Sequence, residues 1–269
     1  MGRKQWTDEK LFDRLLNNRS DSTYWDNIRE LRSRPNNHVF EKAVELTNSK
    51  QPKDRKTGVN ILAQLGVSPR PFYDTTIVLF FNLLEKETDT DVIEALLYAI
   101  GHNNSALNNE QIEKICSFKD FVWKESLVSA LLGIDNEKAI DTLIYLSEDT
   151  SANVRNWATF GIGTQIERDT VPIREALWKR IKDKNEDTKF EAIAGLAKRR
   201  DKKVISIIQK ELMTENYQGL LFEAITSMND TQFIPILNEH FNKNKSNTDI
   251  NPQWLNDLKN CIDSLEENN

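Results

Sequence analysis

Asp149-Thr-Ser-Ala-Asn-Val-Arg-Asn-Trp-Ala-Thr-Phe-Gly-Ile-Gly163 is the clearest copy of a unit that recurs along the chain. A degenerate copy, Asp183-Lys-Asn-Glu-Asp-Thr-Lys-Phe-Glu-Ala-Ile-Ala-Gly-Leu-Ala197, begins 34 positions later. A fixed period of this size is typical of a solenoid, in which stacked helix pairs bury their apolar faces against one another. The sequence therefore predicts an all-α fold, a right-handed α–α superhelix of about six to seven helix pairs with capping helices.

Small residues mark the predicted end of the second helix in each pair. They recur at intervals of 30 to 35 positions, at Gly66, Gly101, Gly133, Gly163, Ala197 and Asn229. The stretch from Tyr24 to Leu31 is a candidate for a degenerate first unit. We therefore expect a single solenoid domain over residues 1–269. It would comprise an N-terminal cap and degenerate repeat over 1–50, helical repeats over 51–235 and C-terminal capping helices over 236–269.

The second helix of the clearest unit combines a polar turn with an apolar stripe. Asp149 to Asn153 supply side chains that can accept hydrogen bonds from the free N–H groups at a helix start. Val154, Ala158 and Ile162 then recur at every fourth position, which places them on one helix face. The same spacing occurs in two other units, at Thr188, Ala192 and Leu196 and at Val92, Leu96 and Ile100. These stripes are the predicted core.

Composition limits the classes of protein that fit. The 269 residues include only 9 glycines and 7 prolines, which favours helices over a β-sandwich or barrel. The formal charge of −6 disfavours nucleic-acid binding, because such proteins normally carry a basic surface. No apolar run approaches the ~18 residues of a spanning helix, and the N-terminus lacks the apolar segment of a signal peptide. We expect a cytoplasmic protein without a membrane attachment.

The sequence contains no catalytic signature. The three histidines are far apart, at His38, His102 and His240, and their spacing does not fit a metal site. Cys116 and Cys261 are expected to be buried thiols in a reducing compartment. Phosphate-binding glycine motifs are missing, and Gly161-Ile-Gly163 belongs to a predicted helix. We therefore expect no enzyme activity, no cofactor and no metal.

Two segments resemble a known repeat family. Val154-Arg155-x-x-Ala158-x-x-x-Ile162-Gly163 resembles the consensus of HEAT repeats in their bacterial variant, which also occurs in phycobilisome-lyase-type repeats. Arg55-Lys-Thr-Gly-Val-Asn-Ile-Leu-Ala-Gln-Leu-Gly66 is similar to a related form. The resemblance covers about residues 50 to 235, and over 154–200 it extends to bacterial HEAT-repeat proteins of unassigned role. It implies an armadillo-type solenoid fold and no particular activity.

The resemblance also implies a ladder between neighbouring repeats, formed by an Asp and an Arg at the positions of Asp149 and Arg155. Only one unit carries this full pair. Lys189 replaces the arginine in the next unit, and the same column holds Gly58, Ile93 and Glu125 elsewhere. The ladder is therefore expected only around Asp149, Arg155, Asp183 and Lys189.

Trp157 is the leading candidate for a contact residue. It lies one position off the apolar stripe, on the helix expected to line the concave face, with Phe160 three positions later. Trp and Arg dominate many binding surfaces. The column of Trp157 contains Asn60, Glu191 and Glu223, with Glu94, Tyr98 and Glu125 nearby. The predicted binding set is Arg155, Asn156, Trp157, Glu191, Glu223, Asn60 and Tyr98.

Each of these features has a structural alternative. Trp157 and Phe160 can pack between repeats, and the acidic column can be a solvated helix face. The only basic run, Lys198-Arg-Arg-Asp-Lys-Lys203, stands at a predicted helix C-terminus, where cations complement the helix dipole; the alternative is a phosphate contact.

The sequence favours a non-enzymatic scaffold that binds a protein or peptide, with a basic partner on a mildly acidic concave face. An adaptor and an inhibitor of the immunity-protein type fit equally. A second hypothesis follows from the resemblance to HEAT-like glycosylases of alkylated bases, with Trp157, Glu191 and the basic run in a DNA-binding cleft. The acidic total charge weighs against it. A third is a lyase-like chaperone for a tetrapyrrole-bearing protein.

Overall fold

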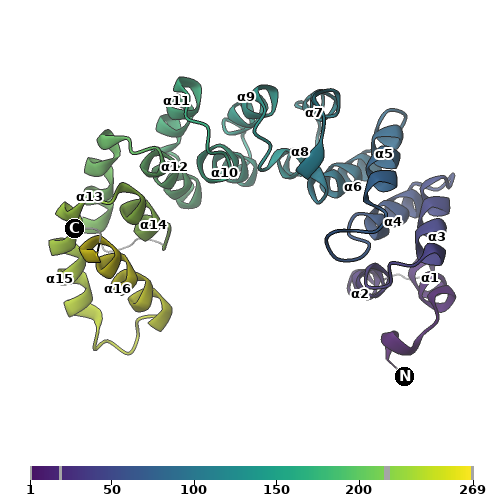
Figure 1. Ribbon diagram of the computed structural model, residues 1–269, viewed down its shortest axis with the longest axis horizontal. Helices are drawn as coiled ribbons and strands as arrows, with labels where there is room; N and C mark the ends of the chain where they lie inside the picture. The colour runs from purple at the N-terminus through teal and green to yellow at the C-terminus, as the bar shows by residue number, and fades with distance from the viewer. Residues whose placement is uncertain (1, 18–19, 215–218, 268–269) are drawn as a thin grey trace. The chain divides into compact units, whose positions relative to one another are not determined.

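The structure is a computed structural model that describes residues 2–17, 20–214 and 219–267 (Figure 1). Over these residues it contains sixteen α-helices and no β-strand, which confirms the predicted all-α repeat fold. Contacts divide the chain into two compact units, unit 1 over Met1–Ile134 and unit 2 over Asp135–Asn269. The expectation of one continuous domain over 1–269 stays a prediction.

Unit 1 consists of four helix pairs, each an odd-numbered helix packed on the even-numbered helix that follows it. The pairs are α1 (Asp8–Leu16) with α2 (Asp21–Arg32), α3 (Asn37–Thr47) with α4 (Pro52–Leu62), α5 (Tyr73–Leu84) with α6 (Thr90–Gly101), and α7 (Asn109–Cys116) with α8 (Lys124–Leu131). Consecutive even-numbered helices also pack on one another, so they form a layer, called here the even layer of unit 1. The short turns η1 (Arg3–Gln5) and η2 (Asn104–Ala106) precede α1 and follow α6.

Unit 2 repeats this plan. Its pairs are α9 (Glu137–Leu146) with α10 (Ala152–Phe160), α11 (Val171–Arg180) with α12 (Glu186–Lys198), α13 (Ile205–Met213) with α14 (Gly219–Met228), and α15 (Ile234–Asn244) with α16 (Pro252–Glu267). The even layer of unit 2 is formed by α10, α12, α14 and α16. A π-helical turn, η3 (Gly161–Gln165), continues α10, and 3₁₀ turns η4 (Lys202–Val204) and η5 (Thr231–Phe233) lead into α13 and α15.

The described chain therefore has eight helix pairs. The six pairs from α3 to α14 correspond to the predicted repeats, and the outer pairs α1–α2 and α15–α16 fall in the segments predicted as caps. The first of the six pairs begins at Asn37, inside the segment 1–50 that the sequence assigned to the cap and a degenerate repeat.

Polar side chains explain where many helices begin. Thr7 Oγ1 accepts a hydrogen bond from the Lys10 N–H at the start of α1 (3.3 Å), and Asn185 Oδ1 accepts one from the Thr188 N–H at α12 (2.9 Å). Asn108 forms a reciprocal capping box with Gln111 at α7. Each cap satisfies N–H groups that have no partner within the helix.

The ends of four even-numbered helices adopt a left-handed backbone conformation. Gly66 and Gly133 have φ angles of 83° and 75°, and Arg200 and Asn229 have φ angles of 51° and 49°. A left-handed residue commonly ends a helix, and glycine adopts this conformation without a steric penalty. Gly66, Gly133 and Asn229, which are three of the six predicted helix ends, are confirmed by this conformation, and a fourth, Gly101, is confirmed as the last residue of α6 without it.

The other three small residues have a different role. Gly101 is the last residue of α6, and Gly163 and Ala197 lie within helical segments, so the prediction that Gly163 and Ala197 end helices was wrong. A Cβ atom on Gly101 would lie 2.6 Å from the Ser129 carbonyl oxygen, and one on Gly195 would lie 2.7 Å from Gly163 Cα. These glycines let the backbones of neighbouring even-numbered helices touch.

The predicted apolar stripes form the core. Val154, Ala158 and Ile162 are buried, as are the corresponding residues of α6 and α12. The apolar stretch 76–84 forms one buried face of α5, although Val78 on the other side is exposed. Across the part of the chain that the structure describes, no helix combines the length and apolar character needed to span a membrane.

The predicted ladder is present around Arg155, which is the fourth residue of α10. Its Nε and Nη2 donate to the two carboxylate oxygens of Asp183 at 2.9 and 3.0 Å. Its Nη1 donates to the carbonyl oxygens of Asp149 and Thr150 at 2.9 and 3.0 Å. The guanidinium therefore joins the turn before its own helix to the turn before α12.

Two further rungs occupy the same place in other helices. Arg55, the fourth residue of α4, donates to both carboxylate oxygens of Glu87 at 2.7 and 2.8 Å and to the carbonyl of Ser49 at 3.1 Å. Lys189, the fourth residue of α12, donates to Glu211 at 2.9 Å. The predicted column was therefore wrong at Gly58, because Arg55 is the residue equivalent to Arg155. Gly58 instead corresponds to Ala158 and contacts α3.

We expect Arg155→Ala to lower the free energy of unfolding by about 2 kcal/mol, because it removes four hydrogen bonds and leaves the Asp183 carboxylate without its main partner. Urea denaturation followed by circular dichroism measures this change. Lys179→Ala is the control, since it breaks the exposed Lys179–Glu148 pair (2.7 Å) and should leave stability nearly unchanged. Equal losses in the two variants would contradict a stabilising role for the rung.

We expect Gly195→Ala to destabilise unit 2 by roughly 1–3 kcal/mol, since the new methyl group would meet the backbone of Gly163 and force the two helices apart. Gly219→Ala is the control, because a Cβ atom there has no neighbour within 4 Å among the described residues. Thermal melts of both variants distinguish a packing effect from a general effect of removing glycine. A melting temperature unchanged in Gly195→Ala would mean that the helices can separate at little cost.

Candidate functional site

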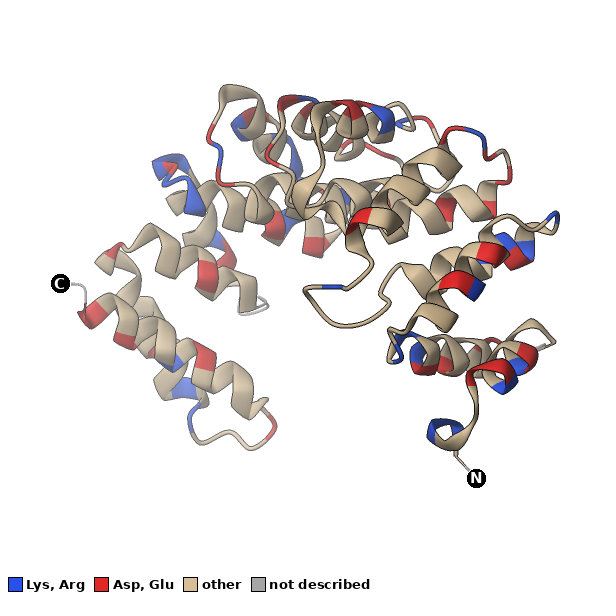
Figure 2. Ribbon diagram, turned by 45° about the vertical axis from the view of Figure 1, so that its right-hand side comes forward, with Lys and Arg blue, Asp and Glu red and all other residues tan. Residues whose placement is uncertain are grey.

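The predicted binding residues fall into two groups, one in each unit. Arg155, Asn156 and Trp157 lie on α10, Glu191 on α12 and Glu223 on α14, all in the even layer of unit 2. Asn60 lies on α4 and Tyr98 on α6, in the even layer of unit 1. Acidic and basic residues are distributed over both units, as Figure 2 shows.

Trp157 is exposed, with half of its surface accessible. Its ring meets the Phe160 ring edge to face, with the centroids 5.7 Å apart. This contact holds the indole in a fixed orientation while leaving half of it open to a ligand. Trp157 is thus neither fully packed between repeats nor free of contacts, and it stays a candidate anchor.

Arg155 and Asn156 are less accessible than Trp157. The bonds of Arg155 to Asp183 and to the preceding turn use most of its donors, and its side chain is only 16% exposed. We therefore leave Arg155 out of the contact set proposed below. Asn156 is half-buried, and its Oδ1 is buried without a hydrogen-bond partner in the described chain.

Glu191 has the most perturbed carboxyl of the predicted set. It is the sixth residue of α12, as Trp157 is of α10, so the two occupy equivalent positions on neighbouring helices. Burial raises the pKa of Glu191 to about 7, and the nearby Glu223 and Asp187 contribute in the same direction. A hydrogen bond from Thr164 Oγ1 (3.2 Å) opposes this shift. Among the described residues, no cation pairs with this carboxylate.

Glu223 borders a hollow between α14 and α16. The hollow has a volume of about 570 Å³ and contains a second carboxylate, Asp257, together with Thr226, Ser227 and Asn260. None of its lining residues in the described chain is basic. Cys261 closes the floor of this hollow, where its thiol lies 3.6 Å from the Phe222 carbonyl oxygen. The surface from Glu191 to this hollow is therefore acidic.

Asn60 and Tyr98 meet in unit 1, where they line one hollow of about 300 Å³ with Lys56, Glu94 and Trp25. Asn60 is buried, and its Nδ2 donates to the Tyr24 hydroxyl at 2.9 Å. Lys56 and Glu94 lie 3.4 Å apart across the hollow. This site is mixed in charge, unlike the acidic surface of unit 2.

The predicted column placed Asn60 beside Trp157, and this register was wrong. Counted from the equivalent arginines Arg55 and Arg155, the counterpart of Trp157 in α4 is Thr57, which is buried. Asn60 corresponds to Phe160. The error follows from aligning α4 on its glycine, which serves helix packing, and not on the arginine that forms the rung.

Two of the five cations in the basic run Lys198–Lys203 form internal contacts, whereas Arg200, Lys202 and Lys203 are exposed. Lys198 pairs with Glu167 at 2.6 Å. Arg199 is buried, and its two terminal nitrogens donate five hydrogen bonds of 2.8–3.0 Å to backbone carbonyls, those of Ile162, Gly163, Ile166, Arg168 and Gly195. Five bonds to one guanidinium compensate for its burial, and they close the end of the π-helical turn. These contacts support the structural interpretation of the run.

Other chemistry-bearing residues do not gather into a site. Within the described ranges, no group of three or more His, Cys, Asp and Glu residues could hold a metal ion. Cys116 and Cys261 are both buried and unbonded to each other, as predicted. A group that the sequence did not reveal is formed by Arg29, Arg32 and Arg70 of unit 1, whose side chains line one pocket with Trp25. They are scattered over 42 positions and share no motif.

We expect Glu191→Gln to change how stability depends on pH. The folded carboxyl retains its proton to about pH 7, whereas an unfolded glutamate loses it near the ordinary value of 4.5. Between these values the folded protein binds more protons, so stability falls as pH rises. The substitution removes this pH-dependent loss of stability. The free energy of unfolding of the variant should therefore exceed that of wild type by about 1–3 kcal/mol at pH 8 and match it near pH 5.

Urea denaturation at pH 5, 6.5 and 8 tests this expectation. Glu175→Gln is the control, because Glu175 is an exposed glutamate of α11 and its substitution should act alike at each pH. A stability difference between Glu191→Gln and wild type that does not vary with pH would show that the carboxyl titrates normally.

Comparisons with known proteins place this architecture among helical repeat proteins. No family model matches the chain. A curated protein, YibA of Escherichia coli strain K12, is 27% identical over 240 residues, covering 87% of this chain and 85% of YibA. The X-ray structure of the E. coli protein is 25% identical and has a TM-score of 0.74, covering 98% of this chain and 93% of that chain.

An engineered protein, 15% identical and with a TM-score of 0.52, covers 97% of this chain and 79% of its own. At this level of identity the likeness concerns the fold alone. The chain is therefore a helical repeat protein that is similar to YibA over most of its length.

Proposed function

We propose that this protein is a non-catalytic binding module, and that the even layer of unit 2 holds a positively charged segment of a partner protein. The observation that carries the proposal is the Glu191 carboxyl, which is half-buried, accepts a hydrogen bond from Thr164 and has no ion-pair partner within the described chain. An ionised carboxylate in this position is costly unless a cation approaches it. Such perturbed groups cluster at functional sites.

The surroundings of Glu191 support a basic ligand. Glu223 interacts electrostatically with Glu191, and the hollow between α14 and α16 adds Asp257 without any basic lining residue. A Lys or Arg side chain placed near Glu191 would favour its ionised form and relieve the repulsion from Glu223. The exposed face of Trp157 adds an aromatic surface that also attracts cations.

The arrangement supports binding more strongly than base excision. Lys198 and Arg199 of the only basic run bond to Glu167 and to backbone carbonyls, so neither supplies a free phosphate contact. Lys198 also lies seven residues beyond Glu191 on α12, about 10 Å along the helix axis. We therefore propose no enzymatic activity and favour an adaptor or inhibitor that acts by recognition. The three rungs support assigning the repeats to the HEAT-like subtype.

A labelled octalysine peptide tests this proposal. In fluorescence anisotropy with the full chain, we expect the double variant Glu191→Gln with Glu223→Gln to weaken binding about fivefold, equivalent to about 1 kcal/mol. Trp157→Ala should weaken binding by a similar or larger factor through lost aromatic contact. Binding by wild type should also decline as pH is lowered from 8 to 6, because Glu191 then takes up a proton.

The matched control is Glu137→Gln with Glu175→Gln, which makes the same change in net charge on the odd-numbered helices α9 and α11. If the two double variants weakened octalysine binding equally, the binding would reflect non-specific attraction to an acidic protein. That result would contradict the proposed site. Co-purification of nucleic acid that high salt removes would instead favour the glycosylase hypothesis.

A further inference from the structure

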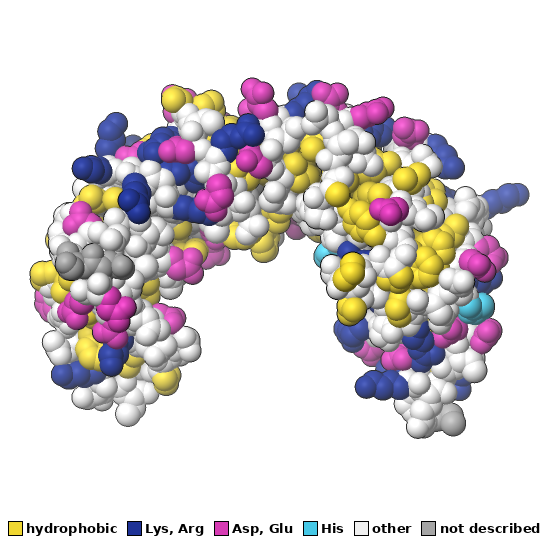
Figure 3. All heavy atoms as spheres, in the orientation of Figure 1, with side chains coloured by type: hydrophobic (Ala, Val, Ile, Leu, Met, Phe, Trp, Pro, Cys, Tyr) yellow, Lys and Arg dark blue, Asp and Glu magenta, His cyan; other side chains and the backbone are white. Residues whose placement is uncertain are grey.

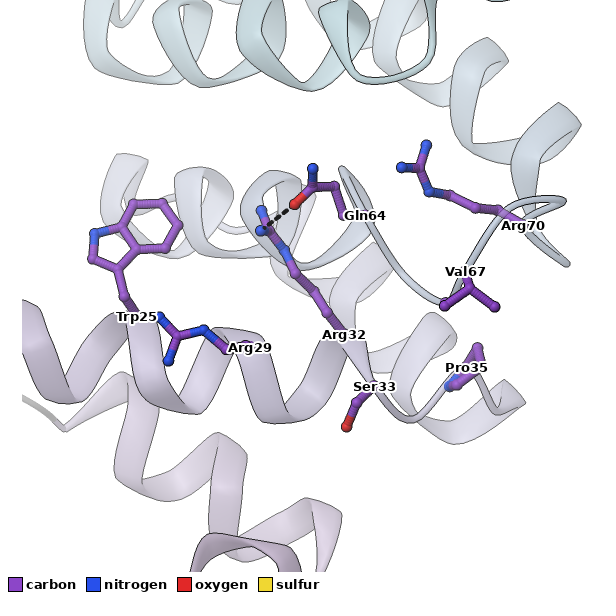
Figure 4. A pocket seen from close by; sticks show the side chains of 9 residues that line it. Trp25, Arg29, Arg32, Ser33, Pro35, Gln64, Val67 and Arg70 are labelled. Carbon is purple, nitrogen blue, oxygen red and sulfur yellow. Dashed lines mark hydrogen bonds between the residues drawn. The ribbon is translucent and has the colours of Figure 1, made fainter. Parts of the chain in front are cut away.

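A pocket in unit 1 gathers three arginines beside an exposed tryptophan (Figure 4). It has a volume of about 650 Å³ and is lined by Trp25, Arg29, Arg32, Ser33, Pro35, Gln64, Gly66, Val67 and Arg70. In the part of the chain that the structure describes, no carboxylate lines it. Three cations thus line a common space whose described lining includes no carboxylate.

Arg32 stands at the centre of this pocket and is bonded only to neutral groups. Its Nε donates to the Asn60 carbonyl at 2.8 Å, and its Nη1 donates to Gln64 Oε1 at 2.7 Å (Figure 4). No described carboxylate lies within ion-pair distance of it. Burial lowers the pKa of Arg32 to about 10, and the positive charges of Arg70 and Arg29 act in the same direction, against the opposing effect of Tyr24.

Arg70 reaches the pocket from the loop between α4 and α5. One terminal nitrogen, Nη1, donates to the His102 carbonyl at 2.8 Å and to Asn103 Oδ1 at 2.6 Å. Its Nε is buried and has no hydrogen-bond partner within the described residues. Because that N–H is shielded from solvent, an anion in the pocket would bind at Nη2, which forms no hydrogen bond with a described residue.

Arg29 and Trp25 form the outer wall. The Arg29 side chain is 77% exposed, and its partner Asp26 (3.0 Å) is shared with Arg3 at 3.2 Å. Trp25 is exposed, and the Arg32 guanidinium lies 6.0 Å from the centre of its ring. Figure 3 shows hydrophobic side chains gathered on the face of unit 1 that this view presents, with basic side chains beside them. Guanidinium forks next to an aromatic ring suit a carboxylate carried by a chain with apolar groups.

We propose that this pocket binds an acidic segment of a partner polypeptide, with one or two carboxylates held by Arg29, Arg32 and Arg70 and the adjoining chain resting on Trp25. Two parallel N–H···O bonds between a guanidinium and a carboxylate are shorter and stronger than neutral hydrogen bonds. The aromatic wall gives the segment a place for its own apolar side chains.

The surroundings favour a short acidic peptide over nucleic acid. The adjoining hollows have mixed charge, since one contains Lys56 and Glu94 and the other contains Arg3, Lys4, Asp26 and Glu30. The basic surface without carboxylates is therefore confined to this pocket, whereas a strand with a phosphate at every nucleotide needs an extended basic surface. The total charge of −6 also opposes a polyanion. This proposal involves unit 1 alone and does not depend on the cationic ligand proposed for unit 2.

A fluorescein-labelled hexaglutamate peptide titrated with the full chain tests the proposal by anisotropy. We expect saturable binding by wild type and a loss of about threefold to tenfold in Arg29→Gln. Arg70→Lys keeps the positive charge but lacks the planar fork, and it should weaken binding by a comparable factor. Arg29 is exposed, so Arg29→Gln remains informative even if a change at Arg70 disturbs the loop.

Arg14→Gln is the matched control, because Arg14 is an exposed arginine of α1 outside the pocket and its loss changes the net charge equally. Absence of hexaglutamate binding by folded wild type, or equal weakening by Arg14→Gln, would overturn the proposal. The proposal would also be overturned if oligothymidylate displaced labelled hexaglutamate at a lower concentration of phosphate groups than the concentration of carboxylates that unlabelled hexaglutamate requires. The pocket would then prefer phosphate. Binding of octalysine tests unit 2 separately, and its failure would leave the hexaglutamate result unaffected.

Discussion

A cation in the first turn of an even-numbered helix joins neighbouring repeats at three places along the chain. Arg55, Arg155 and Lys189 occupy this place, and each bonds to a carboxylate of the repeat that follows. The two arginines also bond to carbonyl oxygens of the turn before their own helix. One arginine side chain thereby joins two loops, and at Arg155 a second arginine, Arg180, adds bonds to the Ser147 carbonyl and to Asp183. The even layers can then present side chains from successive helices in a constant register.

The local spacing of apolar residues was enough to predict the fold, because this spacing can be recognised within a single repeat. The spacing of Val154, Ala158 and Ile162 identifies a buried helix face without reference to any distant residue. The role of each glycine could not be predicted in the same way. Gly66 and Gly163 look alike in the sequence, yet one adopts a left-handed turn and the other contacts the backbone of Gly195. Only tertiary packing distinguishes them.

The candidate sites also could be predicted from the sequence only where they depend on a local pattern. The sequence indicated Trp157, Glu191 and Glu223 by their common register, and the structure places all three on neighbouring helices of unit 2. The raised pKa of Glu191 comes from burial among α12 and its neighbours, which no local pattern encodes. The arginine pocket of unit 1 was not predicted at all, because Arg29 and Arg32 end one repeat and Arg70 comes from the loop of the next. Each half of the chain thus holds a charged group without an ion-pair partner among the described residues, Glu191 in unit 2 and Arg32 in unit 1.

The hydrogen bonds of Arg199 affect which substitutions this sequence can accept during evolution. Its five acceptors are all backbone carbonyls, four of them on the segment from Ile162 to Arg168. Because every amino acid supplies a carbonyl, these hydrogen bonds do not themselves restrict the side chains of the turn, which are restricted instead by packing at Ile162, Gly163 and Ile166. Arg199 itself cannot be replaced without losing these hydrogen bonds. Lysine has too few donors to reach five acceptors, and a neutral residue would leave the carbonyl oxygens without hydrogen-bond donors. The hydrogen bonds that hold this turn therefore depend on one residue, Arg199, which lies 31 to 37 positions further along the chain.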